Sequence, residues 1–422
     1  MSAKHVRVVD VVVVGGGVAG AALAHRLARR GREVLVLERE PVFRDRVRGE
    51  ILYPWGVAAA RRLGALEPLL AAGGRLVPHM SLWTMGTRVE KRHLPTTTPA
   101  GEGCLHMYHP ALQEALLASA RAAGARVRRG AVVTGIERVG ASTGKSDGCF
   151  VSFADGVRAH CVRARLVVGA DGRLSQTRHW GGFEVLRDPP YLRVAGTLVQ
   201  GSLVPDDGAH YCLGPDLATF IAPLGRQRAR MYCIYPGTHG DRHLAGQGRE
   251  HAFLNACRSS MAPAQWFDWV EVIGPLAEFE GAAQAVPRPG RGSVALIGDA
   301  AATTDPSWGC GLSTAMVDVE LLADRLEATE DWEAAVDDYA TAHDDAYGNL
   351  RSILSWMTDL FWTPGADAHA RRADVLSEML AHPADFPDLV GHGPFGEDGA
   401  RAGALAHWNY FGATVGTAPG NT

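Results

Sequence analysis

The sequence predicts an α/β protein in which a largely parallel sheet, assembled from discontinuous segments, carries an inserted, mostly antiparallel sheet and a C-terminal helical segment. Residues 8–38 follow the order strand, glycine turn, helix, strand. Residues 191–236 contain long stretches that alternate between apolar and polar side chains, which is typical of strands with one solvated face. A second short apolar strand at 293–297 precedes the longest helical pattern in the chain, LSTAMVDVELLADRL. The first sheet is therefore expected to be interrupted by the second.

The first of these stretches has the features of a Rossmann-like dinucleotide-binding unit. Val11–Val14 are four consecutive β-branched residues, which suits a strand buried on both faces. Gly15 allows a tight turn, Gly17 lets a pyrophosphate approach the backbone, and Gly20 lets the helix pack close to the strand. The helix N-terminus attracts phosphates, and Glu38 can accept hydrogen bonds from a ribose hydroxyl. The stretch predicts an adenine dinucleotide site, but by itself it does not choose between FAD and NAD.

The segment that follows alternates between short helices and strands. Residues 57–73 predict an amphipathic helix with a break, and residues 79–95 predict two short strands joined at Gly86. A strong helix is expected from Pro110 to Gly124, because proline is tolerated in a first helical turn. Residues 127–139 and 149–171 then predict a β-meander.

Helices dominate the pattern outside the second sheet. One helix is expected near 248–260, and the sequence from Asp331 to about Leu380 is helical in pattern. The Pro/Gly-rich tail from there to Thr422 is expected to be irregular.

Composition narrows the functional classes. The chain of 422 residues carries a net charge of −4 with 21% charged residues, which argues against a nucleic acid or an anionic membrane as partner. Its seven cysteines form no CxxC pair, which favours reduced thiols and a cytoplasmic location. No stretch reaches the ~20 apolar residues of a membrane span. No metal site is predicted, and the chain is expected to be a monomer or homodimer.

Two further motifs join the glycine turn to make a recognisable set. The turn Gly169-Ala-Asp171-Gly172 precedes Ser175 and Arg178, and Gly298-Asp299 precedes Pro306 and Gly309-x-Gly311. With GxGxxG at 15–20, these three ordered motifs resemble the fingerprints of the single-component (group A) FAD-dependent monooxygenases of the para-hydroxybenzoate hydroxylase type. The resemblance covers roughly residues 8–185 and 285–330.

The resemblance implies a division into three parts. An FAD-binding domain would comprise 1–78, 97–185 and 285–330, and a substrate domain 79–96 and 186–284. Residues 331–422 would form a helical cap and tail, with a dimer surface as one possible role.

It also implies the cofactor-binding positions. Asp299 would bind the ribityl chain, and the N–H groups of Gly311 and Leu312 would point at the flavin N1–C2 carbonyl. Trp308 would lie against the ring or act in simple packing. The full expected set is Gly15, Gly17, Val18, Ala19, Gly20, Glu38, Arg39, Arg48, His109, Gln113, Val133, Asp171, Asp299, Ala300, Pro306, Gly309, Gly311 and Leu312.

Some positions remain open at this stage. His109 stands where the family usually has arginine, so either FAD is held more loosely or another arginine substitutes. Arg44, Arg46 and Arg48 suit either a phosphate contact or a solvated loop, and Asp171 suits either the cofactor or a local turn.

The implied activity is insertion of one oxygen atom into an aromatic or polyketide-like small molecule. NADH or NADPH would reduce FAD, visiting transiently because no second GxGxxG follows a strand downstream. O2 would add at flavin C4a, and the resulting hydroperoxide would transfer one oxygen atom. No catalytic residue is identified, but His210, Tyr211, Tyr232 and Tyr235 are candidates for removing a phenolic proton.

Other reaction classes match the motifs less well. A flavin-dependent halogenase shares Gly49-Glu50, but Trp266-Phe-Asp-Trp269 has the wrong spacing for the halogenase tryptophan motif. A flavin-dependent double-bond reductase usually differs over the helix that contains Ala315-Met-Val-Asp318. A non-enzymatic flavin-binding protein has no support beyond the unexplained C-terminal residues.

Overall fold

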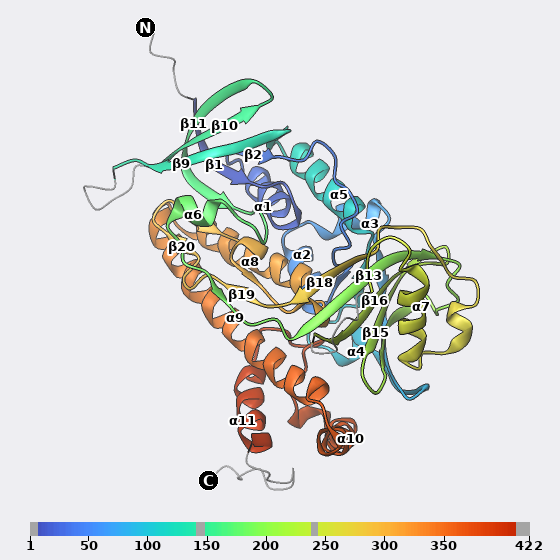
Figure 1. Ribbon diagram of the computed structural model, residues 1–422. Coiled ribbons are helices and arrows are strands. Elements are labelled where there is room, and N and C mark those ends of the chain that lie inside the picture. Colours follow the sequence, from blue (N-terminus) through green and yellow to red (C-terminus); the bar gives the residue numbers. More distant parts are fainter. Residues whose placement is uncertain (1–6, 141–147, 238–243, 411–422) are drawn as a thin grey trace, which may run out of the picture.

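The computed structural model describes residues 7–140, 148–237 and 244–410, and its chain forms two large sheets with helices packed around them (Figure 1). The first sheet has the order β20-β21-β11-β1-β2-β8, with β10 and β9 added beside β11. Its strands are β1 (Arg7–Val14), β2 (Val34–Glu38), β8 (Arg126–Arg129), β9 (Ala131–Arg138), β10 (Cys149–Asp155), β11 (Arg158–Gly169), β20 (Gly290–Arg291) and β21 (Val294–Leu296).

The centre of this sheet is parallel and brings distant segments together. β1 pairs in parallel with both β2 and β11, and β11 pairs in parallel with β21. Val11, Val12 and Val13 are fully buried, as a strand covered on both faces requires. The discontinuous parallel sheet is therefore confirmed. One detail of the meander was wrong, because β8 pairs in parallel with β2 and only β9, β10 and β11 run antiparallel.

The second sheet has the order β17-β13-β16-β15-β14-β5-β6, with β18 beside β13. Every pairing in it is antiparallel except that of β14 with β5, which confirms the inserted, mostly antiparallel sheet. Its strands are β5 (His79–Thr84), β6 (Thr87–His93), β13 (Leu192–Gln200), β14 (Gly208–Leu213), β15 (Ala218–Gly225), β16 (Arg228–Pro236), β17 (Glu271–Val272) and β18 (Ala277–Gly281).

Two small sheets connect these layers. Their strands are β3 (Ile51–Leu52), β4 (Arg75–Val77), β7 (Cys104–His106), β12 (Leu186–Arg187), β19 (Gln284–Ala285) and β22 (Ala302–Thr303).

The helices α1, α5 and α8 pack together beside the first sheet, and α2 packs on α8. The helical segments are α1 (Val18–Arg29), α2 (Pro54–Arg62), α3 (Leu66–Ala71), α4 (Leu94–Thr97), α5 (His109–Ala122), α6 (Thr177–Gly181), α7 (Glu250–Ser259), α8 (Gly311–Ala328), α9 (Trp332–Trp362), α10 (Ala366–Ala381), α11 (Asp398–Tyr410), η2 (Ala264–Phe267), η3 (Gly298–Ala300), η4 (Pro306–Trp308) and η5 (Pro383–Asp385). None of the described helices is long and apolar enough to cross a membrane.

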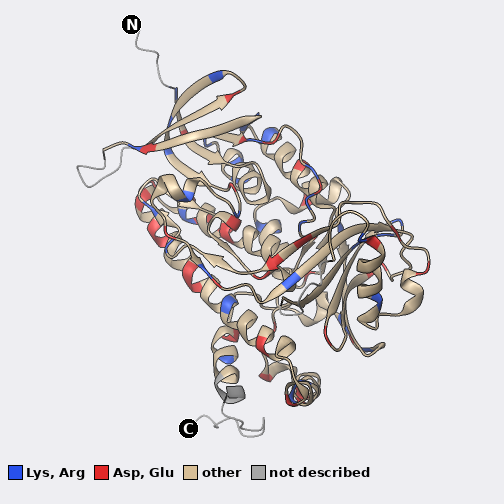
Figure 2. Cartoon of the chain, in the orientation of Figure 1, with Lys and Arg blue, Asp and Glu red and all other residues tan. Residues whose placement is uncertain are grey.

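Two expectations about the C-terminal part were wrong. The longest described helix is α9, with 31 residues, and not α8, with 18. Asp331 caps α9 by accepting from the Ala334 amide, and packing against α8 and α11 supports its length. The tail also contains α11, because that helix gains its stability from docking on α9 (Figure 1). Acidic and basic side chains are interspersed over the helices and sheets (Figure 2).

Candidate active site

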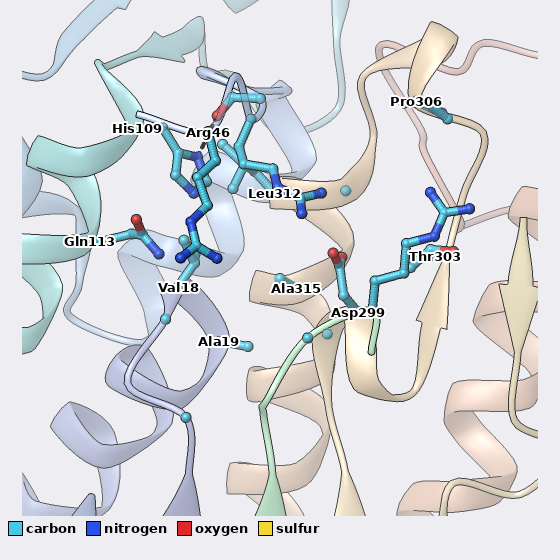
Figure 3. Close-up of a pocket in the computed structure, with 18 of the residues that line it drawn as sticks. Val18, Ala19, Arg46, His109, Gln113, Asp299, Thr303, Pro306, Leu312 and Ala315 are labelled. Atoms are coloured by element: carbon cyan, nitrogen blue, oxygen red, sulfur yellow. Dashed lines mark hydrogen bonds between the residues drawn. The ribbon is translucent and has the colours of Figure 1, made fainter. Parts of the chain in front are cut away.

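A cavity of about 520 Å³ lies between the carboxyl ends of the parallel strands and one face of the second sheet. Its lining includes the turn after β1, the end of β2, the turn after β11 and the N-terminus of α8. Ligands of open α/β sheets bind at this edge. In Figure 3, His109, Gln113 and Arg46 lie on one side of the cavity and Asp299 lies on the other.

The glycines after β1 have different roles: Gly20 allows close helix–strand packing, and Gly17 leaves the backbone open to the cavity. A Cβ at Gly20 would lie 2.0 Å from the Gly15 oxygen, so Gly20 serves helix–strand packing and does not line the cavity. A Cβ at Gly17 would contact only Gln113 Nε2, at 3.7 Å, so its backbone is open on the cavity side. No side chain caps α1 at Gly17, and its first turn carries no acid. The free N–H groups of this helix therefore offer a site for phosphate.

Glu38 lies at the end of β2 and lines the cavity with Arg39. Its carboxylate accepts hydrogen bonds from the Gly16 amide at 2.6 Å and the Glu40 amide at 2.7 Å. The acid therefore organises the glycine turn from which a ribose would be bound.

Asp299 presents an unsatisfied carboxylate to the cavity. The described residues provide it with no side-chain or backbone hydrogen bond, and burial raises the pKa of this carboxyl. Its backbone is fixed by two hydrogen bonds: the Asp318 carboxylate accepts from the Gly298 amide at 2.8 Å, and Arg178 donates to the backbone carbonyl oxygen of Asp299 at 2.6 Å. A fixed carboxylate without a protein partner suits a ligand that donates hydrogen bonds.

The N-terminus of α8 adjoins this carboxylate. Gly309 has a φ of 66°, and a Cβ at Gly311 would meet nothing within 4 Å. No side chain caps this end of α8, and its first turn is free of acids. Pro306, Gly309, Gly311 and Leu312 all line the cavity, so this dipole end can stabilise negative charge there.

The loop around Arg48 explains the departure at His109. The His109 Nδ1–H donates to the Gly49 oxygen at 2.7 Å, and burial lowers the pKa of the ring to about 4. The imidazole is therefore neutral, and its N–H donor supports the loop instead of a ligand. Arg46 lies beside His109 in Figure 3, lines the cavity and pairs with Glu40 at 2.8 Å.

Two predicted positions have local structural duties. The Asp171 carboxylate accepts from the Ser175 hydroxyl and from the Gln176 and Thr177 amides, so it stabilises the start of α6 while also lining the cavity. Ala300 is fully buried and does not line the cavity, and its oxygen accepts from Arg178 at 2.7 Å. The structure therefore does not bring Ala300 to the site, whereas Val18, Ala19, Gln113 and Val133 do line it.

Of the four candidate proton acceptors, two face the cavity. Tyr211 and Tyr232 line it, and the Tyr211 ring stacks on Trp308 with centroids 6.0 Å apart. His210 points to the other face of the sheet, where it packs against Trp83 and Trp266 and bonds the Pro205 oxygen at 2.9 Å. Tyr235 is buried and bonds Glu278. Neither of these two lines the cavity.

A buried charge network joins the Arg48 loop to the second sheet, and the sequence did not reveal it. Arg230 donates to Glu50 at 2.8 Å and to Asp45 at 2.9 Å, while the Tyr232 hydroxyl bonds Glu50 at 2.6 Å. The Arg230 and Glu50 side chains are 0% exposed. Burial raises the pKa of Glu50 to about 7, although Arg230 opposes that shift. The sequence pointed separately to the arginines at 44–48, to Gly49-Glu50 and to Tyr232, but no pattern linked them to Arg230.

These features fit an FAD. The open backbone at Gly17, the acid at Glu38, the unsatisfied Asp299 carboxylate and the uncapped α8 match, in order, phosphates, ribose, ribityl hydroxyls and a ring that gains negative charge.

Comparison with known proteins agrees with this arrangement. The family described as FAD binding domain matches residues 8–350. The chain is 29% identical over 343 residues to ubiquinone hydroxylase UbiL of Rhodospirillum rubrum, covering 77% of this chain and 73% of that protein.

Solved structures share the fold. p-Nitrophenol 4-monooxygenase PnpA of Pseudomonas putida superposes with a TM-score of 0.76 at 21% identity, covering 89% of this chain and 95% of that one. The flavin-dependent brominase Bmp2 superposes with a TM-score of 0.72 at 17% identity, covering 96% of this chain and all of that one. At these identities the likeness shows the fold and does not separate the two reactions.

Proposed function

This chain belongs to the FAD binding domain family and is an FAD-dependent monooxygenase, and from that premise we propose that it inserts one atom of O2 into an aromatic or polyketide-like small molecule. Its reductant is NADH or NADPH, which binds transiently. The observation that carries the proposal is a single cavity that joins the dinucleotide cradle to a face of the second sheet. Cofactor and substrate can therefore meet without an intervening wall.

The residues divide the work of holding the cofactor. The N–H groups at the start of α1 hold the phosphates, with Arg46 and Arg48 as cations close by. Glu38 holds the ribose and repels a 2′-phosphate, and Asp299 holds the ribityl hydroxyls. When bound, FAD supplies the hydride acceptor and the activation of O2.

Other residues set the charge and the water access around the flavin ring. The start of α8 stabilises negative charge at the ring, because its N–H groups are uncapped. Trp308 is 5% exposed and stacks on Tyr211, so together they close one wall of the cavity to water. Exclusion of water protects a reactive oxygen donor from discharge.

Support for oxidation of a ring comes from two relatives, each 29% identical to this chain. One is named ubiquinone hydroxylase and the other 3-amino-4-hydroxybenzoate 2-monooxygenase. The seven free cysteines favour a reducing, cytoplasmic location. We propose a monomer or homodimer, which light scattering would measure.

The function is tested by mass spectrometry of products formed under 18O2 with NAD(P)H and a panel of phenols and polycyclic compounds. One 18O atom per product molecule is expected. Label from water, or turnover without O2, would rule out the monooxygenase. A strict requirement for bromide or chloride would replace it with a halogenase.

A further inference from the structure

The face of the second sheet that lines the cavity is built from uncharged residues. Cross-strand register places Tyr211, Phe220 and Tyr232 in one row, because Tyr211 pairs with Phe220 and Phe220 pairs with Tyr232. A second row contains Ile234, Val194 and Phe279. All six of these residues line the cavity, as does Ala222, and none carries a charge.

The neighbouring row contains a cation that is closed off from the cavity. Arg230 pairs across the sheet with Ala222, so both side chains are on the cavity face. Its guanidinium donates to Glu50 and Asp45, its side chain is 0% exposed, and it is absent from the cavity lining. Its Nη1 has no hydrogen-bond partner among the described residues, but the whole side chain is closed off from the cavity, so Arg230 does not reach a ligand bound there.

None of the arginines that line the cavity belongs to the second sheet, although Arg173 reaches its edge by donating to the Ala282 oxygen at 3.0 Å. They come from the loops around the dinucleotide cradle: Arg39, Arg44, Arg46, Arg48 and Arg173. Arg48 lies over the Phe279 ring at 5.7 Å, but its charge also stabilises the ionised form of Asp299, which places it towards the ribityl site.

The two phenols of this face add little polarity. The Tyr232 hydroxyl is engaged by Glu50 and by the Arg48 oxygen. The Tyr211 hydroxyl is inaccessible to solvent and has no hydrogen-bond partner among the described residues. Its ring is held flat against Trp308. The face therefore offers ring surfaces and aliphatic groups, with no accessible ionic group.

We propose that the substrate is a neutral, flat, apolar molecule that carries no carboxylate or phosphate on the part facing the second sheet. This inference rests on the proposed function and specifies its substrate class. A carboxylate on that part would lose its hydration against apolar side chains and gain no counter-ion, which strongly disfavours binding. A neutral ring gains from burial against Phe220, Ile234 and Phe279.

The experiment compares two ligands that differ by one carboxylate, 2-naphthol and 3-hydroxy-2-naphthoate. Their dissociation constants are measured on the FAD-loaded protein by flavin difference spectra, without NAD(P)H and without O2. Naphthol is expected to bind at least about tenfold more tightly. Equal or tighter binding of the naphthoate would overturn the proposal. If Arg48→Met then lost naphthoate binding, Arg48 would be the counter-ion of that carboxylate.

A variant tests the role assigned to Arg230. Asp45→Asn removes one of its two counter-charges and should shift the affinity ratio about fivefold or more towards the naphthoate. The control Asp337→Asn makes the same change at an exposed site that pairs with Arg288 and is absent from the cavity lining. An unchanged ratio in Asp45→Asn would overturn the account of Arg230. If that variant does not fold, the wild-type ratio still decides the substrate class.

The outcome is separable from the proposed function, because binding is measured without turnover. A naphthoate preference together with 18O incorporation would reject only the substrate class. A naphthol preference without O2-dependent product would reject only the monooxygenase reaction.

Discussion

Replacing Asp299 with alanine should have opposite effects on the FAD-free protein and on FAD binding. In the structure this half-buried carboxylate lines the cavity, and the described residues give its oxygens no hydrogen bond. Burial raises the pKa of the group, so its ionised form destabilises the FAD-free fold. The backbone turn is held independently by Asp318 and Arg178, so it should survive the substitution.

The size of the effect follows from the lost contacts. A hydrogen bond to a charged group contributes about 1.5–3 kcal/mol, so losing one ribityl contact should weaken FAD binding about 10- to 150-fold. The FAD-free variant should be at least as stable as the wild type at neutral pH. A carboxyl with a raised pKa destabilises the fold above its unfolded pKa, so any advantage of the variant should vanish below pH 3.8.

FAD affinity is measured by titrating FAD-free protein while following flavin fluorescence, and stability by chemical unfolding. Asp337→Asn serves as a control, because it removes an exposed acidic charge that pairs with Arg288 and is absent from the cavity lining. Unchanged FAD affinity in a folded Asp299→Ala protein would refute the assigned role. A large loss of stability in the FAD-free variant would refute the claim that its carboxylate lacks a partner.

Three other predictions separate folding from binding. Gly17→Ala should fold normally, because its Cβ would meet only Gln113 Nε2 at 3.7 Å, but it should lose FAD because that Cβ fills the open cavity side of the backbone. Gly20→Ala should lower the free energy of unfolding by about 1–3 kcal/mol, because its Cβ would lie 2.0 Å from the Gly15 oxygen. Circular dichroism melting and FAD titration measure both effects, and identical behaviour of the two variants would contradict the prediction. Glu50 has a folded pKa of about 7 against 4.5, so the wild type should lose about 3 kcal/mol of stability relative to Glu50→Gln as pH rises from about 4 to 8. Parallel unfolding curves at all pH values would show that Glu50 is not destabilised by burial. Glu38→Gln should weaken FAD about tenfold in equilibrium dialysis, since a charged acceptor is lost; undiminished binding would remove Glu38 from the ribose site.

Much of the cradle was predictable because its signals are local. The run Val11–Val14, the glycine spacing and Glu38 all lie within one strand–helix–strand unit, and their roles depend on backbone geometry over a few residues. The strand before Gly298 and the helix after Gly309 have the same local character. The structure places these segments around one cavity.

Other features depend on contacts between distant residues. The meander assignment failed at β8 because sequence pattern does not specify which strand a segment pairs with. The tail helix α11 was missed because docking on α9 stabilises it. Ala300 was expected at the site, but the following turn directs it into the core beside Arg178.

The second sheet shows what the sequence alone does not determine, which is the face that meets the cavity. Alternation establishes that His210 and Tyr211 point to opposite faces, but only cross-strand register and packing decide which face meets the cavity. The sequence by itself predicted a dinucleotide cradle from the glycines and Glu38, because these act through local backbone geometry, and the family resemblance added FAD and the role of Asp299. Only the tertiary structure decided that Arg230 is neutralised by Asp45 and Glu50, because those groups are about 180 residues apart in the chain and meet only when the sheets pack.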